Sequence, residues 1–482
     1  MSVFTKLCLA GAVSAALSAC SLIPAYQRPA APVAAQWPSG EAYQGLPKAE
    51  GKAAADIGWE AFFVDDKMRR LIRLALENNR DLRVAALNIE SARAQYQIQR
   101  ASLFPSVNAS VSGSSQRVSG AANGTGQASI SHSYSAGLGF SAYELDLFGR
   151  LSSLKSQALE NYFSLEETRR GTQITLVAEV ANAWLTLLAD SERLQVSRAT
   201  LSSQQETLAL TQRKLDIGAA TALDVSEAET LVQSARAEAA SYTAQVAQDE
   251  NALALLLGGP LPADLQKGAT LEGQARLADV PSGLPSDLLE RRPDILAAEH
   301  SLKAANANIG AARARFFPSI SLTASAGSAS KDLTELFKAG SGSWSFSPSV
   351  NLPIFNAGSL SANLDAAKVA KDISVAQYEK SVQTAFREVA DALAVRGTID
   401  TQLQAQQALV ASSETSVKLS EARYRVGVDS YLSLLTAQRS LYSARQSLIA
   451  ARLSQAANRV TLYKVLGGGW QPLQQDAAKT AG

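Results

Sequence analysis

The stretch LFPSV at residues 103–107 returns as FFPSI at residues 316–320, an offset of 213. The correspondence continues downstream, where LDLF at 145–148 matches LPIF at 352–355 with an offset of 207. The triplet EVA at 179–181 then matches EVA at 388–390 with an offset of 209. Self-similarity at a nearly fixed spacing indicates an internal duplication. The chain therefore holds two copies of one unit, and the first copy has extra residues before LDLF.

Each copy has the predicted order helix, strand, strand, long helix, helix. The first helices cover 67–102 and 286–315, and Pro105 and Pro318 end them because proline blocks helix continuation. Strand pairs follow at 103–147 and 316–356, where apolar residues alternate with Ser, Thr and Asn. Alternation over about ten residues is typical of a membrane β-barrel strand, although a half-buried soluble strand looks similar. The loops 117–130 and 330–341 are expected to be extracellular.

Long helical hairpins are predicted at 148–257 and 357–466. Apolar residues recur there at alternating steps of three and four, which is typical of coiled-coil packing. The second helix of the first copy carries this stripe at Val225, Ala228, Val232, Ala235, Ala239, Tyr242 and Val246. The segment from Leu151 to Ile217 contains no proline and would extend about 100 Å as a helix. The remaining segments are the N-terminal segment 20–66, the linker 258–285 and the tail 467–482. The fold class is therefore mixed α and β, mainly α-helical.

Four strands cannot close a barrel, because about eight are needed for even a small one. Open sheet edges are not tolerated in lipid. The strands are therefore expected to combine in a dimer, trimer or tetramer, and the pattern alone does not choose among these. No uninterrupted apolar run of 18 or more residues occurs downstream of the N-terminus. Any membrane crossing is thus expected to use strands.

Residues 1–19 read as a lipoprotein signal peptide. A short apolar run follows Lys6 and ends in LSAC at residues 17–20, which places a thiol at the cleavage site. Cys20 is therefore the predicted lipidation site. Ser21 occupies the next position instead of the Asp that usually retains lipoproteins at the inner membrane. This favours the outer membrane.

The composition excludes several functions. A net charge of +1 without a block of like charges argues against a nucleic-acid binder. Two His and two Cys leave almost nothing for a metal cluster or a Cys/His dyad. His132 and His300 are expected to be solvated or packed. No catalytic constellation is found, so the protein is not expected to be an enzyme or to bind a cofactor other than the lipid on Cys20.

Several motifs resemble one known family, the TolC-like outer-membrane efflux proteins, and most closely the OprM-type lipoprotein channels of RND multidrug pumps. The resemblance covers essentially the whole mature chain and rests on CSLIPAYQRP at 20–29, DIGWEAFF at 56–63, ENNRDLRVAALNIE at 77–90, YELDLFGR at 143–150, LPSDLLERRPDI at 284–295, SVNLPIF at 349–355 and VGVDSYLSLLTAQRSL at 426–441. It implies a homotrimer with a 12-stranded barrel, a periplasmic α-helical tunnel and an equatorial belt. It also implies a periplasmic adaptor and an inner-membrane RND transporter as partners.

The interhelical turns at 217–221 and 426–430 carry the implied site. Gly218 and Gly427 suit a left-handed turn between antiparallel helices. The resemblance implies that the turns contact the adaptor, through Gly218, Thr221, Gly427, Asp429 and Ser430. It also implies that they form a periplasmic gate. The glycine turns and the Arg, Tyr and Asp residues beside them lead to the hypothesis that docking of the adaptor turns the second-copy helix pair outward.

The resemblance assigns individual gate roles by position. Leu432 would form a hydrophobic ring that closes the pore, and Arg423, Tyr424 and Arg425 would belong to a network that holds it shut. Asp216 and Asp224 are candidate anionic partners of that network. Thr436 departs from the family, whose close members carry Asp there. If the ring of Asp side chains in those members contributes to cation selectivity or gate strength, both are expected to be weaker here.

Two other functions fit the same residues less well. A duct for type I secretion of a polypeptide would share the fold, but the lipidation motif and RRPDI resemble the drug-efflux branch. A periplasmic coiled-coil scaffold lipoprotein would need no pore, and the duplicated strand pairs argue against it.

Overall fold

The computed structural model describes residues 21–44, 53–122, 124, 126–266, 269–274, 277–278, 281 and 291–470. The predicted signal peptide and Cys20 lie outside these residues, as does the predicted start of a helix at 286. The described chain divides into two compact units. The first contains residues 21–30, 88–165 and 297–378, and the second contains the rest.

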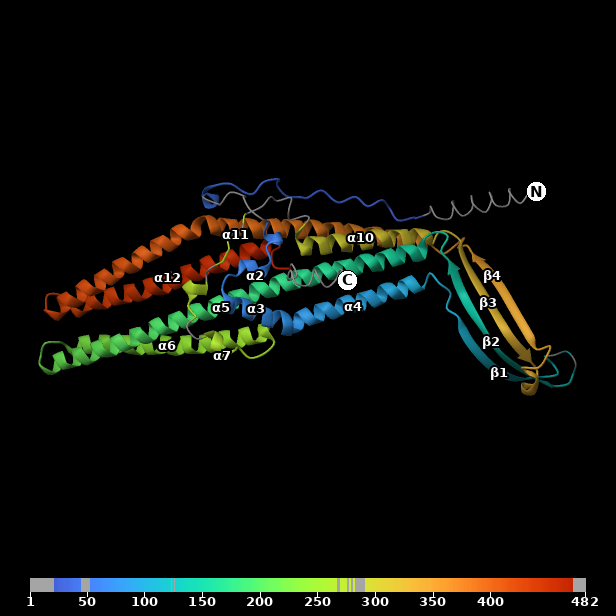
Figure 1. The fold of residues 1–482 in the computed structure, drawn as a ribbon, viewed down its shortest axis with the longest axis horizontal. Helices are drawn as coiled ribbons and strands as arrows, with labels where there is room; N and C mark the ends of the chain where they lie inside the picture. The colour runs from blue at the N-terminus through green and yellow to red at the C-terminus, as the bar shows by residue number, and fades with distance from the viewer. Residues whose placement is uncertain are drawn as a thin grey trace. The chain divides into compact units, whose positions relative to one another are not determined.

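One antiparallel sheet belongs to the first unit, with strand order β1-β2-β3-β4 (Figure 1). Its strands are β1 (Asn108–Val118), β2 (Ser129–Leu145), β3 (Ser319–Ser330) and β4 (Gly342–Asn351). Both predicted strand pairs are thus confirmed, and β2 of the first copy pairs with β3 of the second. The loop between β3 and β4 also contains a short 3₁₀ helix, η3 (Leu333–Glu335).

The register places the alternating apolar residues on one face of the sheet. Ala109 pairs with Leu138, Leu138 with Ala326, and Ala326 with Trp344, so one apolar row crosses all four strands. Serines and glycines occupy the other face, where Ser112 and Ser325 hydrogen-bond to serines of the neighbouring strands at 2.8 Å. The described chain does not cover the apolar face: Trp344 is 81% exposed.

The predicted first helix at 67–102 is in fact two helices, α3 (Asp66–Asn78) and α4 (Arg80–Ala101). Asn79 breaks it, because its side-chain oxygen accepts hydrogen bonds from the amides of Asp81 and Leu82 at 2.9 and 3.0 Å. An Asn oxygen in this role is an N-cap, which starts a new helix. The equivalent helix of the second copy, α10, covers Pro293–Ala314.

The two helical hairpins are α5 (Arg150–Asp216) with α6 (Ala222–Leu257), and α11 (Ser359–Arg425) with α12 (Tyr431–Val465) (Figure 1). The predicted stripe on α6 lies on its inner side, with Ala228, Val232, Ala235 and Ala239 all buried. The three-four spacing therefore marks the buried side of α6. An 18-residue window of α5 is apolar enough to cross a membrane, but 61% of it is buried, as in the core helix of a soluble protein.

The second unit has an aromatic core where chain segments far apart in sequence meet. Phe62 of α2 (Trp59–Phe62) stacks on Tyr463 of α12 with ring centroids 3.9 Å apart. The Tyr463 hydroxyl donates to the carbonyl oxygen of Ile57. The DIGWEAFF motif is thus a packing element. Four more short elements lie in this unit: η1 (Glu41–Tyr43), η2 (Ala54–Asp56), α7 (Ala263–Gln266) and α8 (Leu271–Gln274).

Candidate functional site

The two interhelical turns of the second unit share one backbone design. Gly218 and Gly427 both have left-handed φ angles, 76° and 80°. The amide of each glycine donates to the carbonyl three residues earlier, and the next amide donates five residues back, from Ala219 to Lys214 and from Val428 to Arg423. This is the Schellman pattern that ends helices at glycine. The expectation of left-handed turns is confirmed.

An ion pair braces the turn of the second copy. Arg423 donates from Nε and Nη2 to both carboxylate oxygens of Asp429, at 2.6 and 2.8 Å. These hydrogen bonds hold the pKa of the Asp429 carboxyl below its usual range. A lowered pKa means that the pair contributes above the usual Asp range and is lost only as the pH falls through the lowered value. The ion pair therefore persists at mildly acidic pH.

The turn of the first copy is braced differently. The sequence makes Asp224 a candidate partner of the cationic network, and in the structure its carboxylate accepts a hydrogen bond from the amide of Thr221 at 2.7 Å. The Thr221 hydroxyl oxygen accepts in return from the Asp224 amide at 3.2 Å, which completes a capping box. The position equivalent to Asp429 is Ala220, so this turn cannot form the ion pair. Within the described chain, Arg423 therefore pairs with Asp429. Asp224 instead caps the N-terminus of its own helix, α6.

An aromatic cluster packs next to the turn of the second copy. Tyr431, only 2% exposed, packs with Ala228 and Leu434, and its ring lies 5.5 Å from the ring of Tyr424. The Lys214 ammonium sits 3.8 Å from the Tyr424 ring centroid, within cation–π range. Burial, with smaller contributions from nearby Tyr424 and acidic side chains, raises the pKa of Tyr431 to about 12. Its hydroxyl has no hydrogen-bond partner among the described residues.

The other predicted gate residues lie in the two turns or in the helix ends next to them. Leu432 is 57% exposed, and the Thr436 hydroxyl donates to its carbonyl oxygen at 2.9 Å. Arg425 pairs with Glu421 within its own helix at 2.7 Å. Asp216, at the end of α5, is exposed, and so is Ser430, the N-cap residue of α12. Their roles in a gate remain predictions.

The turns also expose apolar side chains that sequence reasoning did not single out. Ile217, Val426 and Val428 are 79%, 74% and 63% exposed. Ile217 and Val426 occupy equivalent positions in the two copies, and both precede the turn glycine. That repeated apolar residue beside a glycine was the available signal. Exposed apolar tips of this kind suit contact with another protein.

Polar side chains of α5 and α12 join the two hairpins at a distance from the turns. The sequence pattern did not predict these contacts. Ser197 of α5 hydrogen-bonds to Tyr442 of α12 at 2.9 Å, and Gln204 donates to Gln438 at 3.1 Å. A cavity of about 380 Å³ lies beside these pairs. These hydrogen bonds specify how the two hairpins pair at this level.

No reactive constellation is found in the part of the chain that the structure describes. It contains no group of three or more His, Cys, Asp or Glu side chains that could hold a metal ion. His132 hydrogen-bonds to Ser115 of the neighbouring strand at 2.7 Å, and His300 bonds to Glu160 at 2.7 Å. Both contacts are structural.

The comparisons with known proteins all point to one kind of protein, and the matches cover nearly the whole chain. A profile of the outer membrane efflux protein family matches residues 71–259 and 284–468, one segment in each copy. The probable efflux pump outer membrane protein TtgC and the antibiotic efflux pump outer membrane protein ArpC, both of Pseudomonas putida, are each 57% identical over 467 residues. These alignments cover 97% of this chain and 96% of each relative. The crystal structure of the open state of the Neisseria gonorrhoeae MtrE outer membrane channel matches with a TM-score of 0.85 and 40% identity. That match covers 94% of this chain and 99% of the channel.

Proposed function

Because this chain belongs to the outer membrane efflux protein family, we propose that it is the outer-membrane channel of a tripartite RND-type efflux pump. It acts as a passive duct, through which drugs and other small toxic molecules leave the periplasm. The protein lies in the outer membrane and has a large periplasmic part. The transport step needs no chemistry from the chain, since an inner-membrane transporter supplies the energy.

The two faces of the sheet carry this proposal. One face is apolar and uncovered, and the other is lined by serine and glycine. Such a sheet suits lipid on one side and water on the other. Within one chain β1 and β4 each pair on one side only, and unpaired edges are not tolerated in lipid. Three chains would supply twelve strands, with β1 of one chain pairing with β4 of the next.

The interhelical turns are the surface offered to the periplasmic adaptor. Exposed Ile217, Val426 and Val428 supply apolar contact area there. Gly218, Thr221, Gly427, Asp429 and Ser430 shape these tips, and helical hairpins of the adaptor would pack against them. The glycines keep the turns narrow, which lets two helix ends approach a partner together.

Restored drug tolerance tests the proposed function. The chain is expressed in a strain that retains an adaptor and an RND transporter but lacks its outer-membrane channels. We expect tolerance to a hydrophobic antibiotic to rise at least about fourfold, and Val428→Asp to abolish the gain because a charge at an apolar contact is costly to desolvate. Ser202→Asp, at an exposed position on α5, is the matched control. Unchanged tolerance with folded protein in the outer membrane would contradict the proposal.

Native mass spectrometry of the purified protein tests the assembly and the lipid together. We expect a particle of three chains, each starting at Cys20 and each heavier than the polypeptide by the mass of its acyl groups. In Cys20→Ala the acyl mass should disappear while the three-chain particle remains, because the strands hold it together. A monomeric particle would refute the trimer. Unmodified wild-type chains would refute the lipidation.

A further inference from the structure

The N-terminal strap, defined here as residues Leu22–Arg28, packs on α10 within the first unit although it has no helix or strand of its own. Two side chains of α10 hydrogen-bond to the backbone of the strap. The Asn306 side chain donates to the carbonyl oxygen of Pro24 at 2.8 Å, and Arg313 donates to that of Leu22 at 3.3 Å. Asn306 is 2% exposed. These bonds to the strap backbone fix its path along the helix.

A glycine inside α10 makes room for the strap. A Cβ atom at Gly310 would lie 2.6 Å from Cγ1 of Ile23, 2.9 Å from the Ile23 amide nitrogen and 2.7 Å from Oγ of Ser153 on α5. Real Cβ atoms essentially never approach so closely, so another residue at this position would displace both the strap and the Ser153 side chain. Glycine costs helix stability, and the close approach of Ile23 gives a physical reason for its presence in mid-helix.

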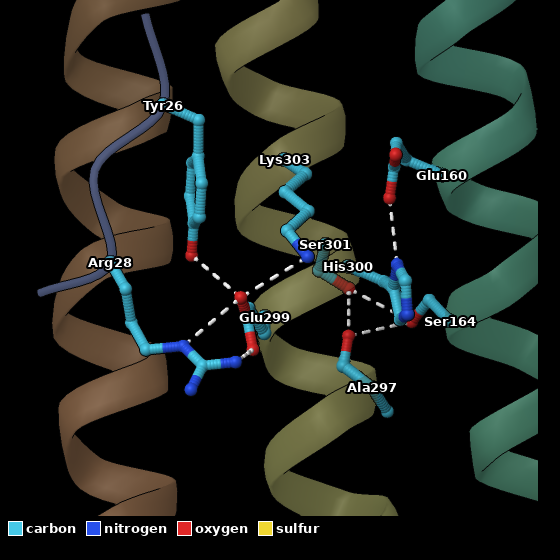
Figure 2. Close-up of polar contacts among 9 residues, drawn as sticks. All are labelled: Tyr26, Arg28, Glu160, Ser164, Ala297, Glu299, His300, Ser301 and Lys303. Atoms are coloured by element: carbon cyan, nitrogen blue, oxygen red, sulfur yellow. Dashed lines mark hydrogen bonds and ion pairs between the residues drawn. The ribbon is translucent and has the colours of Figure 1, made fainter. Parts of the chain in front are cut away.

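The strongest contact is a buried carboxylate that receives three groups (Figure 2). Arg28 of the strap donates from Nη2 to Oε2 of Glu299 at 2.7 Å and from Nε to Oε1 at 3.2 Å. The Tyr26 hydroxyl donates to Oε1 at 3.1 Å, and Lys303 approaches the same oxygen at 3.1 Å. The Glu299 side chain is only 4% exposed, whereas that of Arg28 is 42% exposed.

Two of these three groups come from the strap. Burial opposes ionisation of Glu299, but the hydrogen bonds from Arg28 and Lys303 outweigh it and hold the pKa of the carboxyl below its usual range. Glu299 is therefore charged at neutral pH. Without the strap, Glu299 would keep Lys303 as its ion-pair partner within the described chain, and water would replace Arg28 and Tyr26. The site favours the docked strap because Arg28 makes two charge-assisted hydrogen bonds to the carboxylate, which are stronger than hydrogen bonds between neutral groups.

We propose that Glu299 is a latch that seats the N-terminal strap on α10, and that the latch fixes the place from which the chain enters the molecule. Leu22 is held at Arg313, in the last turn of α10. Strand β3 begins at Ser319, a few residues farther along the chain. The start of the strap is thereby held near the foot of the sheet. The latch does not require Cys20 to be acylated, but a lipid there would be tied to the same place.

Protease access to the strap tests the latch in the native, full-length protein. Chymotrypsin cleaves after Tyr26, and mass spectrometry detects loss of the residues before it. We expect Glu299→Gln to speed this cleavage by about tenfold or more, because it removes the charge that pairs with Arg28 and leaves Arg28 facing Lys303. Arg28→Gln should also speed it, and Arg28→Lys should give an intermediate rate, because lysine keeps the charge but not the two-pronged geometry.

Glu160→Gln is the matched control. Glu160 pairs with His300, the residue next to Glu299, at 2.7 Å, and Figure 2 shows no hydrogen bond or ion pair between Glu160 and the strap residues Tyr26 and Arg28. Its cleavage rate should equal that of the wild type. Heat stability of the assembly should also be unchanged in Arg28→Gln, which separates release of the strap from general loosening. Wild-type cleavage rates in both folded Glu299→Gln and Arg28→Gln would overturn the latch. If Glu299→Gln does not fold, Arg28→Gln alone decides. The readout involves no transport, so it is independent of the proposed function.

Discussion

Replacing Leu432 with serine is expected to open the channel. Leu432 lies in the first turn of α12 beside the braced turn, and its side chain is 57% exposed in the single chain. If three copies meet across a pore, their leucines would bury each other in the closed state. Burying a leucine is worth about 1.5–3 kcal/mol, and serine removes most of that from each chain. We expect the open fraction in planar-bilayer recordings to rise at least about tenfold.

The duplication provides a matched control for this experiment. Leu223 occupies the equivalent position in the first copy, in the first turn of α6, and is 67% exposed. If only the second-copy turn closes the pore, Leu223→Ser should leave the recordings unchanged. Equal currents from the wild type and Leu432→Ser would place the gate elsewhere. Absence of currents from both folded proteins would instead favour the scaffold function.

Replacing Tyr431 with alanine is expected to release the second turn. Tyr431 is 2% exposed and packs against Ala228, Leu434 and Tyr424, so truncation leaves a cavity next to the turn. Truncating a buried aromatic side chain to alanine typically costs about 3–5 kcal/mol. The amides in the first two turns of α12 should therefore exchange hydrogen for deuterium at least about a hundredfold faster, and those near Tyr463 should not change.

Tyr431→Phe separates loss of packing from loss of the hydroxyl. That hydroxyl is buried and has no hydrogen-bond partner among the described residues. Removing a polar group that is not hydrogen-bonded costs little and can even stabilise a protein. Exchange in the phenylalanine variant should match or fall below that of the wild type. If the phenylalanine variant exchanged as fast as the alanine variant, the hydroxyl would have a partner in the assembly and the packing argument would fail.

Much of the fold was predictable because it depends on local pattern. Alternation along 107–113 and 320–326 predicted strands whose apolar residues share a face, and the register from Ala109 to Trp344 has that property. The three-four spacing on α6 predicted its buried side for the same reason, since helix geometry is periodic. The prediction of a single helix over 67–102 was wrong, because the helix is interrupted at Asn79. A buried amide there both caps α4 and reaches the carbonyl of Leu256, and no local pattern reveals the second contact.

The duplication, the strand pairs, the hairpins and the glycine turns could all be inferred from the order of residues, because each is specified by residues close together in the chain. The pairing of individual side chains became visible only once the chain was folded. Arg423 binds Asp429 and not Asp224, because the turn points that carboxylate back at it while Asp224 caps its own helix. Glu299 receives Arg28 from a segment some 270 residues away. Such partners depend on distances in space, which the order of residues along the chain does not encode locally.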